Sequence, residues 1–358
     1  MFAHGERNLT AMPQRPFPSG TIVNDRYEFV QKLGSDGDVY EAHDRNLDRR
    51  VALKLLHPIA GVSQSWEEAQ RLEHLRSRFL VEVINADVVG NSDLRFITTP
   101  LLDNGDLENA ARHTGLSVHD AVRYMQQVCT GVGRIHAAGM IHRDIKPANV
   151  LMGDDGVFVS DLQLCAILDA DGRAGRNGSF CTLAPEAAPD DGFCSLPTDI
   201  YSLGATAFYL LAGKYPVDHE LPKSEQRERI AAGRLRQVRD LAPHVSQALG
   251  TVIRKALSID PSRRHASAEA FANALTQASN RGRNWRRVGH SGHLYCLEGL
   301  PIQGRTAIAI CSEADGVDVE IRARSVPTNR RISGYRDERV GKTQLVRRIQ
   351  QLVKALSS

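Results

Sequence analysis

The sequence predicts an α+β protein that consists of a strand-rich lobe, a helix-rich lobe and a small C-terminal α+β domain. Strand-like apolar alternation dominates residues 27–56, whereas helical spacing dominates from residue 105 to about residue 277. The charge then changes sign. Residues 280–358 carry 15 basic and 7 acidic side chains, a balance of +8, whereas the preceding residues carry 30 and 35, a balance of −5. We therefore expect a domain boundary near residue 280.

The composition indicates a soluble globular protein. The 358 residues are 42% hydrophobic and 24% charged, enough for one large core and a smaller one. No apolar run approaches the roughly 20 residues that a membrane helix needs, and residues 1–20 lack the apolar segment of a secretory signal. The six cysteines are far apart and form no Cys-x-x-Cys pair. We therefore expect a reduced, cytoplasmic protein without a membrane partner, whose residues 1–26 form a flexible N-terminal segment.

The elements of the first lobe are strands with one helix. Gly34 and Gly37 interrupt the strand pattern of residues 27–56. The stretch SQSWEEAQRLEHLRSR, residues 63–78, has helical spacing, and two further strands are expected near 82–89 and 94–99.

The second lobe begins with a capped helix. Ser117 and Asp120 form a start that resembles a capping box, an apolar stripe runs from Ala121 to Ile135, and Gly139 can end the helix. Short strands are expected at about 149–160, and helices from about 197 to 277.

The string HRDIKPAN, His142 to Asn149, carries residues suited to phosphoryl transfer. Asp144 would accept the proton of a hydroxyl nucleophile, and Lys146 would neutralise charge on the transferred phosphate. Asn149 would bind a metal ion through its amide oxygen. The string is too specific to be explained as an ordinary polar turn.

With this loop, the chain resembles the soluble, eukaryotic-type serine/threonine protein kinases of bacteria from about Tyr27 to Leu275. The matching segments are VALK at 51–54, the WEEAQRL helix, the aspartate of DLQ at 161–163 and APE at 184–186. The resemblance implies the bilobal protein-kinase fold, with a cleft between the lobes and the kinase domain at 27–277. It also implies that Asp199 braces the catalytic loop and that Arg264 pairs with Glu186, both as structural contacts.

The resemblance further implies transfer of the γ-phosphate of ATP to a protein serine or threonine, with Mg²⁺ (or Mn²⁺). In this family a lysine at the position of Lys146 marks serine/threonine specificity, and APE indicates a protein substrate. Lys54 would bind the α/β-phosphates and pair with Glu68, for which Glu67 and Glu73 of the same helix are the alternatives. The implied catalytic residues are Asp144, Lys146 and Asn149; the metal ligands are Asn149 and Asp161; and the nucleotide-binding residues are Gly34, Gly37, Val39, Ala52, Lys54, Glu68, Thr99 and Leu101.

Three segments depart from the family pattern. The glycine-rich loop of KLGSDGDVYEA, residues 32–42, is two residues short between Leu33 and Val39. In DLQ, Gln163 replaces a glycine, and we expect it to restrict backbone flipping at Asp161, because φ > 0 costs a non-glycine residue roughly 1–2 kcal/mol. In GSFCTLAPE, residues 178–186, Thr182 replaces the family's tyrosine, whereas Ser179 keeps the hydroxyl that contacts the catalytic loop. Upstream, no Ser, Thr or Tyr lies between Asp161 and Gly178, so Arg143, which often receives an activating phosphate in this family, has no evident covalent partner.

The C-terminal domain, residues 284–358, matches no family that we recognise. HLYCLEGLP, RTAIAICSE and VDVEIRARS predict three strands, and GKTQLVRRIQQLVKAL predicts a helix. A core of about 75 residues is marginal, so we expect it to pack on the kinase or a partner. Gly334 and Gly341 have six residues between them where a phosphate loop needs four, which favours a plain helix start.

Two features of this domain leave alternatives open. His290, His293, Cys296 and Cys311 are zinc-binding residue types, but the sequence favours a turn that leads into two strands. The charge of +8 indicates either an acidic protein or nucleic-acid partner, or simply a solvated basic face.

We interpret the chain as an active serine/threonine protein kinase. The alternative is a pseudokinase, or a weakly active nucleotide-gated binding module, whose basic domain recruits a protein or nucleic-acid partner. A third reading is a kinase that its tail recruits to nucleic acid or to a stress or defence complex. The short loop and Gln163 favour the second reading. Lys54, Asp144, Asn149 and Asp161 together favour the first.

Overall fold

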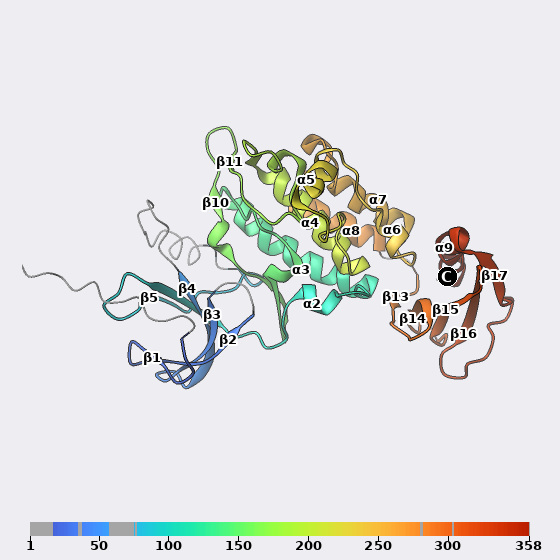
Figure 1. The fold of residues 1–358 in the computed structure, drawn as a ribbon, viewed down its shortest axis with the longest axis horizontal. Helices are drawn as coiled ribbons and strands as arrows, with labels where there is room; N and C mark the ends of the chain where they lie inside the picture. The colour runs from blue at the N-terminus through green and yellow to red at the C-terminus, as the bar shows by residue number, and fades with distance from the viewer. Residues whose placement is uncertain are drawn as a thin grey trace, which may run out of the picture. The chain divides into compact units, whose positions relative to one another are not determined.

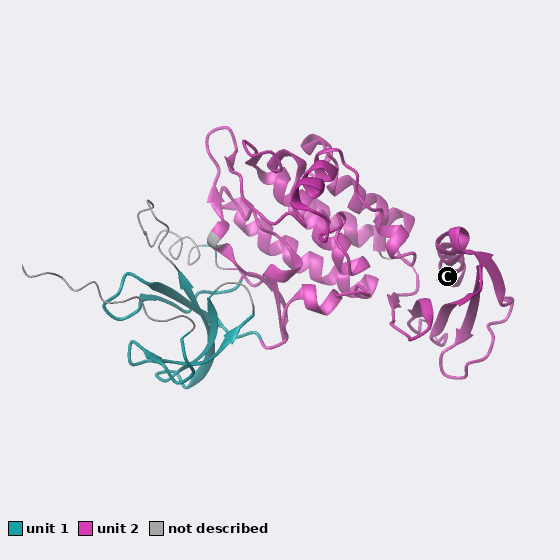
Figure 2. Ribbon diagram, viewed as in Figure 1, with its two compact units in different colours: residues 1–76, 81–102 teal, residues 77–80, 103–358 magenta. Residues whose placement is uncertain are grey.

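The computed structural model describes residues 17–34, 38–56, 75, 77–279, 282–302 and 304–357. The chain forms two compact units, residues 1–76 with 81–102, and residues 77–80 with 103–358 (Figure 2). In the described part of the chain, no helix combines the length and the apolar character that a bilayer crossing requires.

The first unit is an antiparallel sheet with strand order β1-β2-β3-β4-β6-β5 (Figure 1). Alternate residues of its strands are buried around Tyr27, Phe29 and Tyr40, as the period of a strand requires. Phe17 stacks on Phe29 with ring centroids 5.0 Å apart, so part of the N-terminal segment belongs to this core. The helix expected over 63–78 lies almost entirely outside the described residues. The strands are β1 (Ile22–Val23), β2 (Tyr27–Leu33), β3 (Val39–Asp44), β4 (Arg49–Leu56), β5 (Asn85–Val88) and β6 (Arg95–Pro100).

Helices dominate the second unit, as predicted. The long helix α3 starts at Ser117, whose hydroxyl accepts a hydrogen bond from the Asp120 amide, and Gly139 follows its end with φ of 72°. Helix α4 is buried from Thr198 to Ala212 and forms the centre of this lobe. The helices are α2 (Leu107–Ala111), α3 (Val118–Ala137), α4 (Leu196–Ala212), α5 (Lys223–Ala231), α6 (Val238–Leu241), α7 (Gln247–Ala256) and α8 (Ala268–Ser279).

Short strands and 3-10 turns connect these helices. Strands β7 (Met140–Ile141) and β10 (Ala166–Ile167) pair, as do β8 (Val150–Gly153) with β9 (Gly156–Val159) and β11 (Ala174–Gly175) with β12 (Phe193–Cys194). The 3-10 turns are η1 (Pro147–Asn149), η2 (Leu162–Leu164), η3 (Pro185–Ala187) and η4 (Pro261–Arg263).

The C-terminal region is a five-stranded antiparallel meander, β13-β14-β15-β16-β17, with helix α9 (Figure 1). The prediction of three strands was incomplete, and the helix begins at Leu345, after the 3-10 turn η5 (Lys342–Gln344). Leu297, Ile310 and Ile321 form its core with Ile349 and Leu352 of α9. The elements are β13 (Trp285–Arg287), β14 (His293–Gly299), β15 (Ile308–Asp315), β16 (Asp318–Ser325), β17 (Glu338–Gly341) and α9 (Leu345–Leu356).

Candidate active site

The catalytic loop lies between β7 and β8, and three donors hold the Asp144 carboxylate. The Ser179 amide donates to Oδ1 at 2.9 Å, Asn149 Nδ2 donates to Oδ2 at 3.0 Å, and Lys146 Nζ lies 3.0 Å from Oδ2. Lys146 Nζ also donates to the Ser179 hydroxyl at 2.8 Å. Asp144 is only 4% exposed. The three predicted catalytic residues therefore form one cluster, and the expected contact of the Ser179 hydroxyl with this loop is confirmed.

The electrostatics of this cluster favour an ionised carboxylate. Burial raises the pKa of Asp144, but the hydrogen bond from Ser179 and the charge of Lys146 outweigh burial, so the pKa is lowered overall. Burial alone would lower the pKa of Lys146, but the Asp144 carboxylate raises it above its usual value. Asp144 is thus ionised at neutral pH, with the Lys146 cation beside it.

Asp199 of α4 fixes the start of the same loop. Its buried carboxylate accepts hydrogen bonds from the amides of His142, at 2.8 Å, and Arg143, at 3.0 Å. His136 Nε2 lies 2.8 Å from the same carboxylate. Burial raises the pKa of Asp199, but the hydrogen bond with His136 and nearby positive charge lower it overall. The predicted bracing role of Asp199 is confirmed, and His136 is a partner that the sequence did not indicate.

The His142 ring has its tautomer fixed by its neighbours. Nδ1 lies 3.2 Å from the Asp144 amide, which is a donor, so Nδ1 accepts. Nε2 lies 3.1 Å from the Ser160 carbonyl, so it carries the proton and donates. The ring therefore links the catalytic loop to the residue before Asp161.

Asn149 and Asp161 have the donor chemistry that Mg²⁺ requires. The amide nitrogen of Asn149 donates to the backbone carbonyl of Asp144 at 2.8 Å, so the atom of this side chain that suits a metal ion is the amide oxygen. Asp161 supplies a carboxylate and adopts the left-handed conformation, with φ of 58° and ψ of 50°. Because this conformation is strained for a non-glycine residue and such strain gathers at functional sites, Asp161 fits a metal-holding position.

In the DLQ segment, the residue with positive φ is Asp161 and not Gln163. Gln163 lies in the 3-10 turn η2, a backbone conformation that needs no glycine. The restricting role of Gln163 stays a prediction.

The segment between Asp161 and Glu186 is held by contacts that need no phosphate. Arg143 Nε donates to the Leu164 carbonyl at 2.5 Å, and Nη1 donates to the Gly175 carbonyl at 2.9 Å. The pairings of β10 with β7 and of β11 with β12 fix the segment at two further places. The guanidinium of Arg143, for which the sequence offered no phosphorylated partner, thus donates hydrogen bonds to backbone carbonyls.

Glu186 and Arg264 form the predicted ion pair. Both guanidinium terminal nitrogens donate to the carboxylate at 2.7 Å, and the Arg264 side chain is fully buried. Thr198 Oγ1 donates to the same carboxylate at 2.9 Å. The APE segment is therefore anchored to α4 and to the turn at Arg264.

The described residues among those implied in nucleotide binding lie in the first unit. Lys54 and Ala52 belong to β4, opposite Val39 and Thr99 respectively, and Leu101 follows β6. Gly34 has φ of 70°, which favours glycine. Gly37 and Glu68 lie outside the described residues. The nucleotide-binding roles stay predictions.

Comparison with known proteins agrees with this geometry. The chain is 32% identical over 280 residues to the serine/threonine-protein kinase PknJ of Mycobacterium tuberculosis, an alignment that covers 71% of this chain and 45% of the relative. It is 29% identical over 262 residues to PrkC of Bacillus subtilis, covering 70% and 40%. It is 28% identical over 275 residues to the DNA damage-responsive kinase RqkA of Deinococcus radiodurans, covering 72% and 40%.

The chain thus spans less than half the length of these relatives. A family model described as the protein kinase domain matches residues 27–275, which include the catalytic loop, Asp161, Glu186 and Arg264. The chain belongs to the protein kinase family.

Proposed function

We propose that the chain is an active serine/threonine protein kinase that transfers the γ-phosphate of ATP to a protein hydroxyl. The observation that carries this proposal is the state of Asp144, a buried carboxylate with a lowered pKa, held by Ser179, Asn149 and Lys146. A pseudokinase has no need of a proton acceptor oriented in this way.

Each residue of the cluster has a distinct role. Asp144 takes the proton of the substrate hydroxyl. At the same time the hydroxyl oxygen of the substrate forms a bond to the γ-phosphorus, and the bond between this phosphorus and the leaving oxygen of ADP breaks. Lys146 offsets charge on the transferred phosphoryl group. Asn149 and Asp161 hold Mg²⁺ or Mn²⁺, which when bound neutralises charge on the nucleotide phosphates. Lys54 binds the α/β-phosphates, with Glu68 as its partner, and the other nucleotide contacts come from Gly34, Gly37, Val39, Ala52, Thr99 and Leu101.

We infer that activity does not require phosphorylation between Leu162 and Gly178. This stretch has no hydroxyl side chain, and Arg143 already binds two of its carbonyls. In kinases that depend on phosphorylation, ordering of this loop comes from new contacts between the phosphate and arginine. Here the backbone supplies the acceptors.

A hollow of about 730 Å³ beside the APE segment supports a protein substrate. Its lining includes Phe180, Arg176, Lys223, Arg227 and Glu228. Lys223 Nζ lies 5.8 Å and the Arg227 guanidinium 5.7 Å from the centroid of the Phe180 ring. A lining of one aromatic ring, three bases and one acid, in which Arg176 and Arg227 also pair with Asp190, suits a polypeptide segment that carries an acidic side chain.

For the C-terminal domain we propose an acidic protein or nucleic-acid partner. Six of its seven acidic side chains lie in ion pairs with arginines, so the excess positive charge falls on other side chains. Arg330, Arg336, Lys342 and Arg347 are among the exposed bases. Nucleic-acid binding that weakens steeply with salt would support this role. The cytoplasmic location is likewise our inference from composition.

The deciding experiment follows transfer of labelled phosphate from ATP with Mg²⁺ to the protein itself and to a generic protein substrate. We expect labelled phosphoserine or phosphothreonine with the wild type and a loss of at least about 100-fold with Asp144→Ala. Asp171→Ala, which removes an exposed aspartate of the segment between Asp161 and Glu186, is the matched control. Equal labelling of wild type and Asp144→Ala, or ATP binding without transfer, would overturn the proposal.

A further inference from the structure

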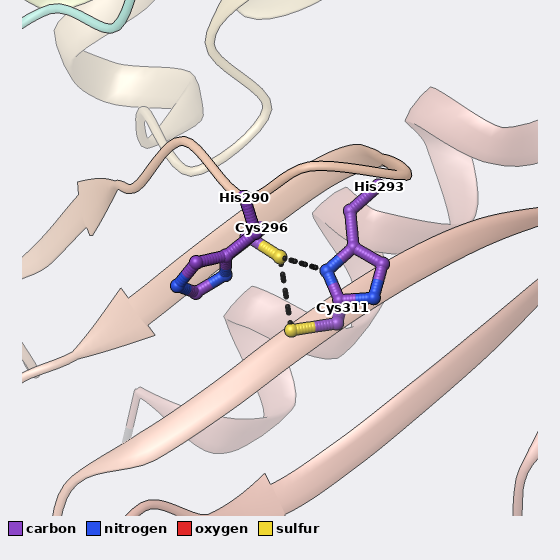
Figure 3. Close-up of side chains that lie close together, drawn as sticks. All are labelled: His290, His293, Cys296 and Cys311. Carbon is purple, nitrogen blue, oxygen red and sulfur yellow. Dashed lines mark hydrogen bonds between the residues drawn. The ribbon is translucent and has the colours of Figure 1, made fainter.

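Four metal-binding side chains of the C-terminal region lie together in the structure. His290, His293, Cys296 and Cys311 each direct one ligand atom into a cluster in which all four atoms lie within 4.8 Å of one another (Figure 3). His293 Nδ1 is 2.9 Å from Cys296 Sγ, and the two sulfur atoms are 3.0 Å apart. No part of the kinase chemistry uses these residues.

The fold brings these residues together by a β-bulge. His293 and Cys296 are three positions apart, so in a regular strand they would face opposite sides of the sheet. The register of β14 against β15 shifts between His293 and Tyr295, where β14 carries one extra residue. His293 then pairs with Glu313, and Cys296 pairs with Cys311, so both side chains emerge on one face.

The fourth residue comes from the β13–β14 connection. The Val288 amide donates to the Cys296 carbonyl at 2.9 Å, which continues the hairpin past the end of β13. Gly292, with φ of 83°, turns the chain back, and the rings of His290 and His293 lie with centroids 5.9 Å apart. A loop, a bulged strand and a neighbouring strand therefore each contribute to one point.

We propose that the C-terminal region binds one Zn²⁺ ion through His290, His293, Cys296 and Cys311. Two thiolates and two imidazoles are the ligand set of many structural zinc sites. Zinc–sulfur bonds of about 2.3 Å in a tetrahedron place two sulfurs about 3.8 Å apart, so the two sulfurs, 3.0 Å apart in the structure, need to separate by about 0.8 Å. With four protein ligands the site is closed to substrate, which makes its role structural.

The position of the cluster on the sheet indicates what bound zinc would stabilise. Leu297 and Ile310, the strand neighbours of Cys296 and Cys311, belong to the core that α9 covers. Because successive strand residues alternate, the four ligands lie on the sheet face opposite that core. Zinc would join the β13–β14 connection to β15 on the face of the sheet opposite α9, in a C-terminal region whose described apolar core is small.

The test is the metal content of the full chain. The protein is purified with its affinity tag removed, under reducing conditions and in zinc-containing buffer, then dialysed against a weak chelator and analysed by mass spectrometry of the elements. We expect one zinc per chain, which separates this ion from catalytic Mg²⁺. His293→Ala, Cys296→Ser and Cys311→Ser should each lower zinc at least tenfold. Cys129→Ala, which removes a buried thiol of α3, should keep it.

A second measurement covers variants that fail to fold. Wild type loaded with Co²⁺ in place of zinc should show the ligand-field and thiolate charge-transfer absorption of tetrahedral coordination, and His290→Ala should change that spectrum. Folded wild type that holds no zinc would overturn the proposal. So would unchanged zinc content in Cys296→Ser or Cys311→Ser, or a Cys296–Cys311 disulfide that forms under these conditions and excludes the metal.

Discussion

Removing the Glu186 carboxylate should destabilise the helical lobe strongly. Glu186→Ala leaves the guanidinium of Arg264, whose side chain is fully buried, without its counter-charge. Breaking a buried pair by removing one partner costs about 3–5 kcal/mol. Arg264 keeps hydrogen bonds to the carbonyls of Pro197, Ser258 and Ile259, at 2.8, 2.9 and 3.2 Å, so we expect the lower end, about 3 kcal/mol. For a lobe of this size that corresponds to a fall in Tm of about 6–12 °C.

Calorimetry of the full chain measures this loss, and a double-mutant cycle isolates the pair. Glu186→Leu with Arg264→Met should be more stable than the sum of the single changes predicts, by at least about 1 kcal/mol. Recovery should be incomplete, since three carbonyls lose their donor. Glu225→Ala, which breaks an exposed pair with Arg229, is the control and should cost about 0.3–0.5 kcal/mol. Single changes that add within about 0.5 kcal/mol would refute the coupling.

Three further perturbations test the site and the core. Arg143→Gln should lower kcat about 10- to 100-fold, because the Leu164 and Gly175 carbonyls lose their donor, and it should not change the phosphorylation state of residues 162–178. Steady-state kinetics measures kcat and mass spectrometry of the protein measures its bound phosphate; an unchanged kcat would contradict the role. Gly178→Ala should destabilise the lobe by about 1–3 kcal/mol, because φ is 120° and a Cβ would lie 2.5 Å from the Arg143 carbonyl oxygen; denaturant titration measures it against Gly133→Ala, where a Cβ meets open space. Burial, and to a smaller extent the charge of Arg287, lower the pKa of His244 to about 4. The pKa of histidine in the unfolded chain is about 6.5. The stability that depends on neutral His244 is therefore fully present above about pH 6.5 and is lost as the pH falls through the pKa of the folded protein. His244→Leu should remove up to about 3 kcal/mol of acid destabilisation in unfolding titrations from pH 7.5 to 4.

Much of the fold follows from short-range patterns in the sequence. The apolar stripe of α3 and the alternation in β14, β15 and β16 were predicted at nearly their observed bounds. Strand β17, with the sequence ERVG, was missed because its charged residues and four-residue length give no alternation to detect. It exists because its backbone pairs with that of β16 from Asp318 to Ile321. A strand that depends on its neighbour's edge leaves little trace in its own residues.

The active site shows the same division. The residues of HRDIKPAN were identified because their types and spacing carry the chemistry. The carbonyl partners of Arg143 were not identified, because every residue carries the same backbone carbonyl and the sequence does not show which carbonyls Arg143 contacts. His136 pairs with Asp199 across 63 positions, and nothing in the sequence relates the two. In the C-terminal region, the sequence favoured a turn that leads into two strands over a zinc site, because the β-bulge that brings His293 and Cys296 to one face depends on the pairing with β15.

Helix α4 links the catalytic loop and the APE segment through three residues of one stretch. Thr198 binds Glu186, Asp199 holds the amides of His142 and Arg143, and the Ser202 hydroxyl donates to the Thr182 carbonyl at 2.9 Å. These positions span about 6 Å of helix at 1.5 Å per residue, so the helical pitch itself sets the spacing of the segments. Apolar residues of α4 can therefore exchange during evolution, but an insertion or deletion between Thr198 and Ser202 would rotate one contact by about 100° away from the others. We therefore expect that substitutions at apolar positions of α4 are tolerated more often than changes in the length of the stretch from Thr198 to Ser202.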